Sequence, residues 1–184
     1  MWLKWISSWA LVVSTLNASA QTQDRPLDIL ARPGVHAIMR HATAPGIGDP
    51  SNFTLGNCAT QRNLNRDGVL ESENLGQRFR SLRLEFTAVY SSQWCRCLDT
   101  ARALNVGRVM ELPALNSFFQ NRDTRMAQTT ALLSFVRSLK PSDKVLLVTH
   151  QVNITAFTGI VPSPGEVILF RLNEQGELEV LGRL

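Results

Sequence analysis

Short apolar runs alternate along the chain with longer segments whose apolar residues recur at helical spacing. Four of the short runs predict strands: Gly34–Met39, Phe86–Tyr90, Val145–Val148 and, with weaker strand character, Arg108–Leu112. Three of the periodic segments predict helices: Asp67–Arg83, Trp94–Asn105 and Thr124–Leu139. Because strands alternate with helices, we expect an α/β fold of three layers, with a mixed, mostly parallel central sheet flanked by helices.

The segments outside this alternation complete the expected organisation. Near the C-terminus, Val167–Leu172 and Leu178–Leu181 predict a hairpin through the turn Asn173–Gly176. Residues 42–65 are rich in glycine, proline and asparagine and predict a loop, whose length suggests a functional role. We expect a polar linker over residues 21–33 and a single domain over residues 34–184.

The first twenty residues have the pattern of a secretory signal peptide. Lys4 precedes an apolar stretch from Trp9 to Leu16, and the small residues Ala18–Ala20 follow. This stretch is too short to span a bilayer, which needs about 20 apolar residues. The sequence therefore predicts signal cleavage, a periplasmic or secreted protein and no stable membrane span afterwards, with an uncleaved membrane anchor as the less favoured alternative.

The chain has three cysteines, Cys58, Cys95 and Cys97. The Cys95 and Cys97 pair lacks the second pair of cysteine or histidine ligands that a zinc site needs. An exported protein favours disulfides, so we expect one bridge and one free thiol. Cys58 could pair with either Cys95 or Cys97, and all three could instead be free.

The charge pattern argues against a nucleic-acid partner. The formal net charge is only +4, and no block of consecutive basic residues occurs. Arginine dominates the cations, which suits recognition of a small anion.

Four residues near predicted strand ends carry the candidate chemistry. Arg40 and His41 follow the strand that begins at Gly34, and His150 follows the strand that begins at Val145. Arg96 lies in the first turn of the helix after Phe86–Tyr90. In an open α/β sheet such residues converge at the carboxyl edge. One histidine could attack a phosphorus atom while the arginines bind its oxygens.

Four segments in this order resemble the histidine phosphatase superfamily, also called the phosphoglycerate mutase-like family. Arg40, His41 and Ala42 are similar to its Arg-His-Gly hallmark at the end of the first strand. Further similarity is carried by three stretches: TQRNLNRDGVLESENLG from Thr60, VYSSQWCRCLDTA from Val89 and VLLVTHQ from Val145. The resemblance covers nearly all of the chain after the predicted signal peptide.

This resemblance implies a role for each matching residue. His41 would be the nucleophile that forms a phosphohistidine, Arg40 and Arg96 would bind phosphate, and His150 would donate to the phosphoryl oxygens. Ser91 or Ser92, and Arg62, would be further phosphate contacts. The implied mechanism needs no metal and no cofactor.

Two positions depart from the family pattern. Ala42 replaces the hallmark glycine, and Asn116 stands where many members have a glutamate that protonates the leaving group. Asparagine cannot act as an acid. We take Asp123 as the first candidate acid, with Asp49 and Glu166 as alternatives. A phosphoramidate, an anhydride or an aryl phosphate would need less help from an acid.

These observations predict an exported phosphatase that hydrolyses a phosphomonoester or related phosphoryl compound. Phosphohistidine phosphatases and lipopolysaccharide-core phosphatases are the small family members it most resembles, which implies a phosphorylated small molecule or envelope component as partner. Phytase-type motifs are absent, and a glycolytic mutase would not be exported. A non-catalytic phosphate-binding or interaction module is the alternative, and an unrelated surface role ranks below it. The sequence leaves the oligomeric state open.

Overall fold

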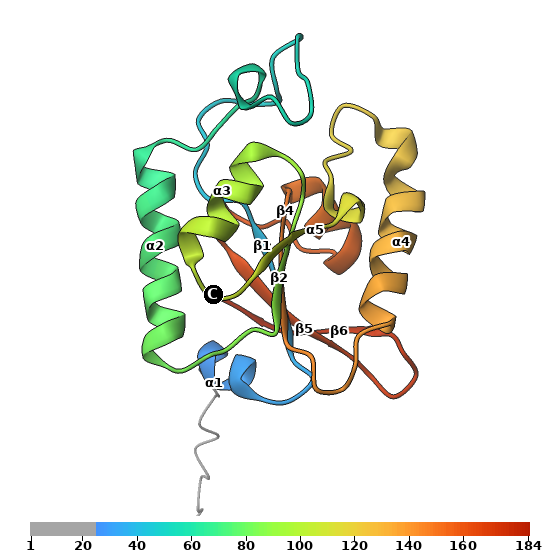
Figure 1. The fold of residues 1–184 in the computed structure, drawn as a ribbon. Coiled ribbons are helices and arrows are strands. Elements are labelled where there is room, and N and C mark those ends of the chain that lie inside the picture. Colours follow the sequence, from blue (N-terminus) through green and yellow to red (C-terminus); the bar gives the residue numbers. More distant parts are fainter. Residues whose placement is uncertain (1–24) are drawn as a thin grey trace, which may run out of the picture.

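The computed structural model describes residues 25–184, so the predicted signal peptide lies outside the described residues. Helices cover both faces of a central sheet, and the long loop after the first strand rises above one edge of that sheet (Figure 1). The expected three-layer α/β architecture is confirmed.

The described residues form one six-stranded sheet in the order β3-β2-β4-β1-β5-β6. The strand bounds are β1 His36–Arg40, β2 Ala88–Ser91, β3 Val109–Glu111, β4 Val145–Thr149, β5 Val167–Leu172 and β6 Leu178–Arg183. β1, β2, β3 and β4 are parallel, whereas β5 pairs antiparallel with both β1 and β6. The hairpin of β5 and β6 confirms the pairing expected near the C-terminus.

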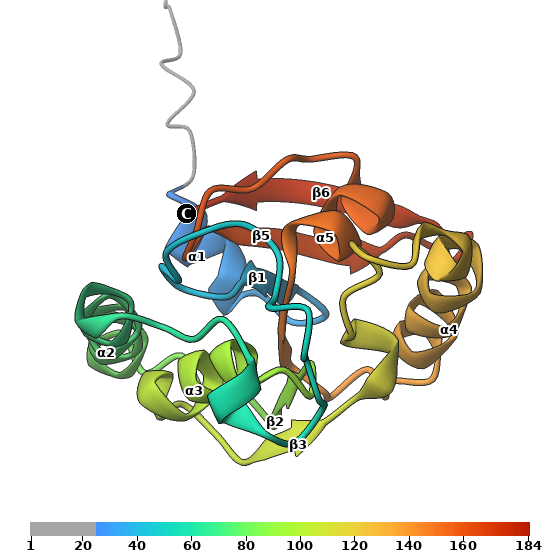
Figure 2. The ribbon, with the colours of Figure 1, turned by 90° about the horizontal axis from the view of Figure 1, so that it is seen from above.

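Two groups of helices enclose the sheet (Figure 2). α1, α2 and α3 lie on one face, while α4 and α5 lie on the other. The helix bounds are α1 Pro26–Ala31, α2 Arg66–Ser81, α3 Cys95–Leu104, α4 Arg125–Arg137 and α5 Gln151–Thr158. Short 3₁₀ turns span Cys58–Thr60, Pro113–Leu115 and Arg122–Thr124.

Alternate residues of the strands fill the two cores because successive strand side chains point to opposite faces. Met39 and Val148 pack with the first helix group, together with Phe79 of α2. Ile38 and Leu147 pack with the second group, together with Leu132 of α4. The strands therefore bury both faces, which explains their continuous apolar runs.

Strand register places the candidate residues at one edge of the sheet. Arg40 is opposite Thr149 in the parallel pair of β1 and β4, and Ser91 is opposite Val148 in the pair of β2 and β4. The chain therefore leaves all three strands at the same level, so that His41, Ser92 and His150 follow at neighbouring positions.

Two helices differ from the sequence expectation. The expected linker 21–33 contains α1, in which Leu30 is fully buried against the core, so this segment belongs to the domain. The sequence pattern predicts no element over α5, in which Val152, Ile154 and Thr155 are β-branched residues with low helix propensity. Burial of Ile154 against the sheet outweighs that preference.

The first turn of α2 also corrects a detail. The helix begins at Arg66, and Asn65 is its N-cap, since the Asn65 side chain accepts a hydrogen bond from Gly68 N at 2.9 Å. Asp67, the expected cap, lies inside the first turn, where a negative charge is favourable to the helix dipole.

Candidate active site

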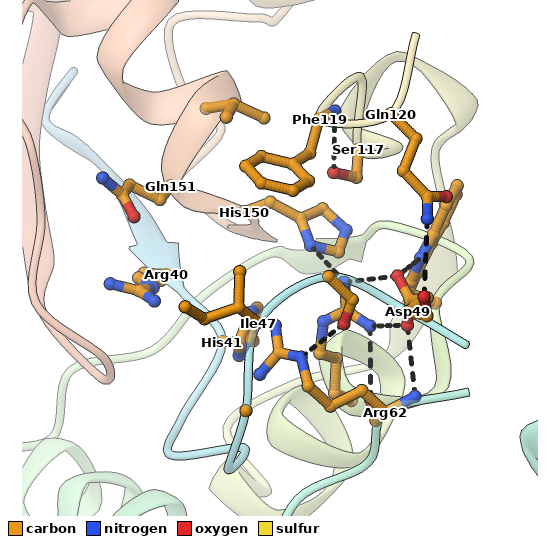
Figure 3. Close-up of a pocket in the computed structure, with 15 residues that line it drawn as sticks. Arg40, His41, Ile47, Asp49, Arg62, Ser117, Phe119, Gln120, His150 and Gln151 are labelled. Atoms are coloured by element: carbon orange, nitrogen blue, oxygen red, sulfur yellow. Dashed lines mark hydrogen bonds and ion pairs between the residues drawn. The ribbon is translucent and has the colours of Figure 1, made fainter. Parts of the chain in front are cut away.

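A cavity of about 240 Å³ opens at the carboxyl edge of the sheet (Figure 3). Its charged and aromatic floor and its rim come from β1, α3 and α5 and from the segments that follow β1, β2, β3 and β4. The described residues that line it are Arg40, His41, Gly46, Ile47, Gly48, Asp49, Arg62, Trp94, Arg96, Ser117, Phe119, Gln120, His150, Gln151 and Val152. Five of the predicted site residues therefore converge here: Arg40, His41, Arg62, Arg96 and His150.

His41 and His150 face each other across this space, with ring centroids 5.5 Å apart. The backbone fixes the first of them, because His41 N donates to Thr149 O at 2.9 Å. Both side chains are buried. The parallel pairing of β1 and β4 thus sets the distance between the two imidazoles.

His41 has the proton arrangement of a nucleophile. Its Nδ1 lies 2.8 Å from the carbonyl oxygen of Ala42. A carbonyl only accepts, so Nδ1 carries the proton and Nε2 keeps its lone pair. Burial, assisted by the charges of Arg96, Arg62 and Arg40, lowers the pKa of His41 to about 3 against the opposing effect of the Ala42 hydrogen bond. His41 is therefore neutral near pH 7.

Three guanidinium groups give the cavity its positive charge. Arg40 is half-buried and donates from Nη1 to Pro162 O at 3.0 Å, and Arg62 donates from Nε to Gly48 O at 2.8 Å and from Nη1 to Ala44 O. The Nε atoms of Arg40 and Arg96 are buried without a hydrogen-bond partner among the described residues. Buried donors are normally paired, so the unpaired ones here are consistent with an anion site.

Asp49 is the single carboxylate among the described residues that line the cavity. Its oxygens accept from Arg96 Nη1 at 2.6 Å and Arg96 Nη2 at 3.1 Å. They also accept from Trp94 Nε1 at 3.0 Å and from Arg62 N at 3.1 Å. Burial by itself would raise the pKa of Asp49, but the hydrogen bonds and charge of Arg96 hold it below its ordinary value.

This network changes the role expected for Asp49. A carboxylate that accepts four hydrogen bonds and has a lowered pKa is a poor proton donor. Asp49 instead fixes the orientation of Arg96, because both partners are buried and the contact is bidentate. The sequence signal for this role was weak, since one aspartate in a glycine-rich loop is usually a surface residue.

His150 is joined to Arg96 on one side and to Ser92 on the other. Arg96 Nη2 lies 3.4 Å from Nδ1, and Ser92 Oγ lies 2.9 Å from Nε2. Guanidinium only donates, so Nδ1 accepts and Nε2–H donates to Ser92. The Ser92 hydroxyl in turn donates to Asn116 Oδ1 at 3.3 Å. Burial, together with the charge of Arg96, lowers the pKa of His150 well below its ordinary value.

These contacts revise two expectations. Donation from His150 to a phosphoryl oxygen would require its Nε2–H to leave Ser92. Neither Ser91 nor Ser92, one of which the resemblance implies as a phosphate contact, is among the described residues that line the cavity, and Ser91 donates from its hydroxyl to Ser92 O at 2.8 Å. Because side chains alternate along a strand, Ser92 contacts the histidine and Ser91 points elsewhere.

The expected acid is also placed elsewhere. Asp123 does not line the cavity with His41 but a separate hollow beside Arg122 and Met126, in the turn before α4. Glu166 accepts from Arg183 and from Ser163 N, and it does not line the cavity either. Within the loop after β3, the side chain of Phe119 lines the cavity, whereas that of Asp123, four residues later, lines the separate hollow.

Asn116 occupies the position where a family glutamate was expected. Its Oδ1 accepts from Gln93 N at 2.9 Å as well as from Ser92, and its backbone oxygen accepts from Asn153 and Gln128. Asn116 therefore ties the turn after β2 to α4 and α5 and offers no acidic proton.

A disulfide between Cys58 and Cys95 ties the loop after β1 to the first turn of α3. This confirms one bridge with one free thiol and selects between the two pairings left open by the sequence. Cys95 is adjacent to Arg96, so the bridge holds the loop that carries Asp49 and Arg62 next to its ion-pair partner. Cys97 is free and buried, with its sulfur 3.5 Å from His150 Nε2.

Two further findings concern the described residues alone. Over residues 25–184, no group of three or more histidine, cysteine, aspartate or glutamate side chains is arranged to hold a metal ion. No helix within the same range has the length and apolar character needed to cross a membrane.

Comparison with known proteins gives a match in structure but not in sequence. No family model matches the chain, and a search of curated proteins finds no match. The protein histidine phosphatase SixA complexed with tungstate superposes with a TM-score of 0.58 at 16% identity, over 82% of this chain and 96% of that chain.

Two other solved structures give the same picture. Phosphoserine phosphatase from Entamoeba histolytica, in complex with 3-phosphoglyceric acid, has a TM-score of 0.58 at 12% identity, over 81% of this chain and 95% of that chain. A mycobacterial glucosyl-3-phosphoglycerate phosphatase has a TM-score of 0.56 at 12% identity, over 81% of this chain and 97% of that chain. The chain therefore has the fold of the histidine phosphatase superfamily, which its four sequence motifs resemble.

Proposed function

We propose that this chain is an exported histidine phosphatase that hydrolyses a phosphomonoester through a phosphohistidine on His41. One observation carries the proposal: a neutral imidazole with a free Nε2 faces a cavity that is lined by three guanidinium groups. The fold shared with solved phosphatases supports it.

The charges of the cavity match a phosphate ester. Arg40, Arg62 and Arg96 contribute three positive charges and Asp49 one negative charge, which leaves two positive charges when both histidines are neutral. A phosphomonoester dianion carries the complementary charge. Because guanidinium groups can stabilise the charge that develops on the phosphoryl oxygens, we propose that the reaction proceeds without a metal ion.

The reaction has two steps. His41 Nε2 attacks phosphorus and forms a P–N bond, while the ester P–O bond breaks and its electron pair leaves with the alcohol oxygen. The alkoxide takes a proton from water, which leaves hydroxide. A second water molecule then attacks phosphorus and gives its proton to that hydroxide, while the P–N bond breaks and its electron pair returns to Nε2. Arg96, oriented by Asp49 and His150, is placed to stabilise the phosphoryl group in both steps.

Export is part of the same proposal. A disulfide forms and persists in an oxidising compartment, so the Cys58–Cys95 bridge supports a periplasmic or secreted location. The segment 1–20, with the pattern of a signal peptide, would direct it there. Sequencing the N-terminus of the protein recovered from the host would show whether cleavage follows Ala20.

The experiment that tests the nucleophile is a trapping assay with the His41→Ala variant. Wild-type protein mixed with a labelled phosphate ester and quenched in base should hold label as a phosphohistidine, whereas the variant should not. Turnover should fall by about 10³-fold or more. His36→Gln is the matched control, because His36 lies at the other end of β1, and its turnover should stay within about twofold of wild type.

Among the described residues that line the cavity, no carboxylic acid is available as a proton donor. This favours one second candidate, a phosphate-binding module without turnover. That function predicts that wild-type protein binds inorganic phosphate but neither accumulates label nor releases product. Turnover that His41→Ala abolishes would exclude the binding module, whereas turnover that survives the substitution would exclude His41 as the nucleophile.

A further inference from the structure

The rim of the cavity is apolar where its floor is charged. Ile47 is 92% exposed and Phe119 is 42% exposed, and both line the cavity. They come from different loops, the first after β1 and the second after β3 (Figure 3). Large apolar side chains left open at the mouth of a cavity indicate that a ligand covers them.

The two loops approach each other closely at this rim. A Cβ placed on Gly48 would lie 3.8 Å from Cε1 of Phe119, so Gly48 brings the first loop alongside the phenyl ring. Ile47 stands between Gly46 and Gly48, both of which have positive φ. That backbone turn presents Ile47 outward instead of into the core.

The polar groups of the rim argue against a ligand with a second anionic group. Among the described lining residues, Ser117, Gln120 and Gln151 are neutral, and the four charged side chains belong to the floor. A second anionic group on the substrate would therefore find no cation among the described lining residues of the rim, because Arg122 is not one of them and lies over the Phe119 ring, with its Cζ 5.7 Å from the ring centroid. The rim suits an uncharged, apolar group attached to the phosphate.

The floor limits the chemistry of that group. Asp49, the one carboxylate of the described lining, uses its oxygens on Arg96, Trp94 and Arg62. His41 Nδ1–H is held by Ala42 O, and His150 Nε2–H is held by Ser92. A leaving group must therefore depart as a stable anion and take its proton from water.

From the apolar, uncharged rim and from the lack of an available acid among the described floor residues, we infer that the substrate is an aryl phosphate. This is the phosphate ester of a phenolic hydroxyl on an uncharged aromatic ring. This inference rests on the proposed function. The phosphoryl group lies on the arginine floor, and the ring lies between Ile47 and Phe119. When His41 Nε2 forms its bond to phosphorus, the P–O electron pair leaves on the phenolate oxygen, which then takes a proton from water.

Two sets of substrates test the leaving group. Phenyl phosphate and 2-naphthyl phosphate should be hydrolysed at least about 100-fold faster than glycerol phosphate, because an alkoxide needs an acid whereas a phenolate does not. Within a series of ring-substituted phenyl phosphates, kcat/KM should rise steeply as the phenol becomes more acidic. A flat series, or equal rates on glycerol phosphate, would overturn the inference.

Two rim variants test the ring site. Ile47→Ser and Phe119→Ala should each raise KM for 2-naphthyl phosphate by about five- to tenfold, because each removes apolar surface that the ring covers. Inhibition by inorganic phosphate should not change, since phosphate contacts only the floor. Leu82→Ala, at an apolar residue that follows α2 and is 50% exposed, is the control and should leave KM unchanged.

The outcomes separate the inference from the proposed function. If both rim variants keep the wild-type KM while His41→Ala still abolishes turnover, the ring site is wrong and the phosphatase stands. If none of these esters is hydrolysed and inorganic phosphate does not bind, both are wrong.

Discussion

The cavity has one wall built by strands and another built by a loop, and the two walls are fixed by different interactions. His41 and Arg40 on the strand wall are placed by backbone hydrogen bonds, from His41 N to Thr149 O and from Arg40 N to Glu166 O. Asp49 and Arg62 on the loop wall are placed by side chains and by a disulfide.

The difference shows how a flexible segment can carry a rigid site. Sheet pairing sets the positions of the histidines without any particular side chain, since the backbone of every strand forms those hydrogen bonds. The loop after β1 contains several glycines and has no regular pairing, so it needs the bidentate contact of Asp49 with Arg96 and the bridge to Cys95. Disturbing these contacts should therefore affect the loop wall first.

The largest effect is expected from Asp49→Asn. The substitution removes the anion that pairs with buried Arg96 and accepts from Trp94 and Arg62. The free energy of unfolding should fall by about 3 kcal/mol, as when one partner of a buried ion pair is removed. Turnover should fall by about 100-fold, because Arg96 loses its orientation.

Urea unfolding and steady-state kinetics measure both changes. Asp123→Asn makes the same chemical change at an exposed carboxylate and should alter neither quantity by more than experimental error. If kcat for Asp49→Asn equals that of wild type, the contact of Asp49 with Arg96 does not matter for turnover.

Cys58→Ser should have the next largest effect. The bridge closes a loop of sequence separation 37, so its loss should lower the free energy of unfolding by about 3 kcal/mol. It should also lower kcat/KM, because the loop wall is no longer held against α3. A reductant should destabilise the wild type to the level of the variant and leave the variant unchanged.

The matched control for the bridge is Cys97→Ala, which removes the free thiol but keeps the disulfide. This variant should still lose stability on addition of reductant. A wild-type protein that is indifferent to reductant would show that the bridge contributes nothing to the loop wall.

The strand wall makes stability depend on pH. His41 is neutral in the folded protein because its pKa is lowered to about 3, whereas the unfolded chain protonates this residue near pH 6.5. Below pH 6.5 the unfolded state binds more protons, so stability falls as the pH falls. His41 alone should cost about 1.5 kcal/mol between pH 6.5 and pH 5.

Urea unfolding of wild type and His41→Asn at these two pH values measures this dependence. Between pH 6.5 and pH 5, the free energy of unfolding of the variant should fall by about 1.5 kcal/mol less than that of wild type. Parallel losses in the two proteins would mean that His41 is not buried in its neutral form.

The smallest expected effect separates two neighbouring serines, both fully buried. Ser92→Ala removes the acceptor for His150 Nε2–H and the donor to Asn116, so kcat should fall by about tenfold. Ser91→Ala removes only a hydrogen bond to Ser92 O and should change kcat by less than about twofold. Equal effects on kcat would contradict the assignment of Ser92 as the residue that supports His150.

The strand wall could be predicted from the sequence. Two apolar runs that each end next to a histidine are sufficient to place His41 and His150 at one edge of a parallel sheet, because the edge follows from topology. The same reasoning predicts the succession of strands and helices along the chain, except for α1 and α5. Those two are short, and burial of Leu30 and Ile154, not periodicity, stabilises them.

The loop wall could not be predicted in the same way. The contact of Asp49 with Arg96 joins residues that are 47 positions apart, and no periodic pattern records such a pair. The hydrogen bond between Asn116 and Ser92 leaves no trace in the sequence pattern either. From the sequence, Asp123 is a candidate acid only because it is a carboxylic acid. Ile47 and Phe119 resemble ordinary surface residues until the two loops are placed side by side.

The position of Cys97 has a consequence for how the protein matures. Burial raises the pKa of the Cys97 thiol to about 12, so in the folded protein very little of it is the thiolate that attacks disulfides. Thiol exchange with the nearby bridge is thereby suppressed once the chain has folded. Incorrect pairing of Cys58 with Cys97 can then form only in the unfolded chain, and after folding the Cys58–Cys95 disulfide no longer exchanges with the buried thiol.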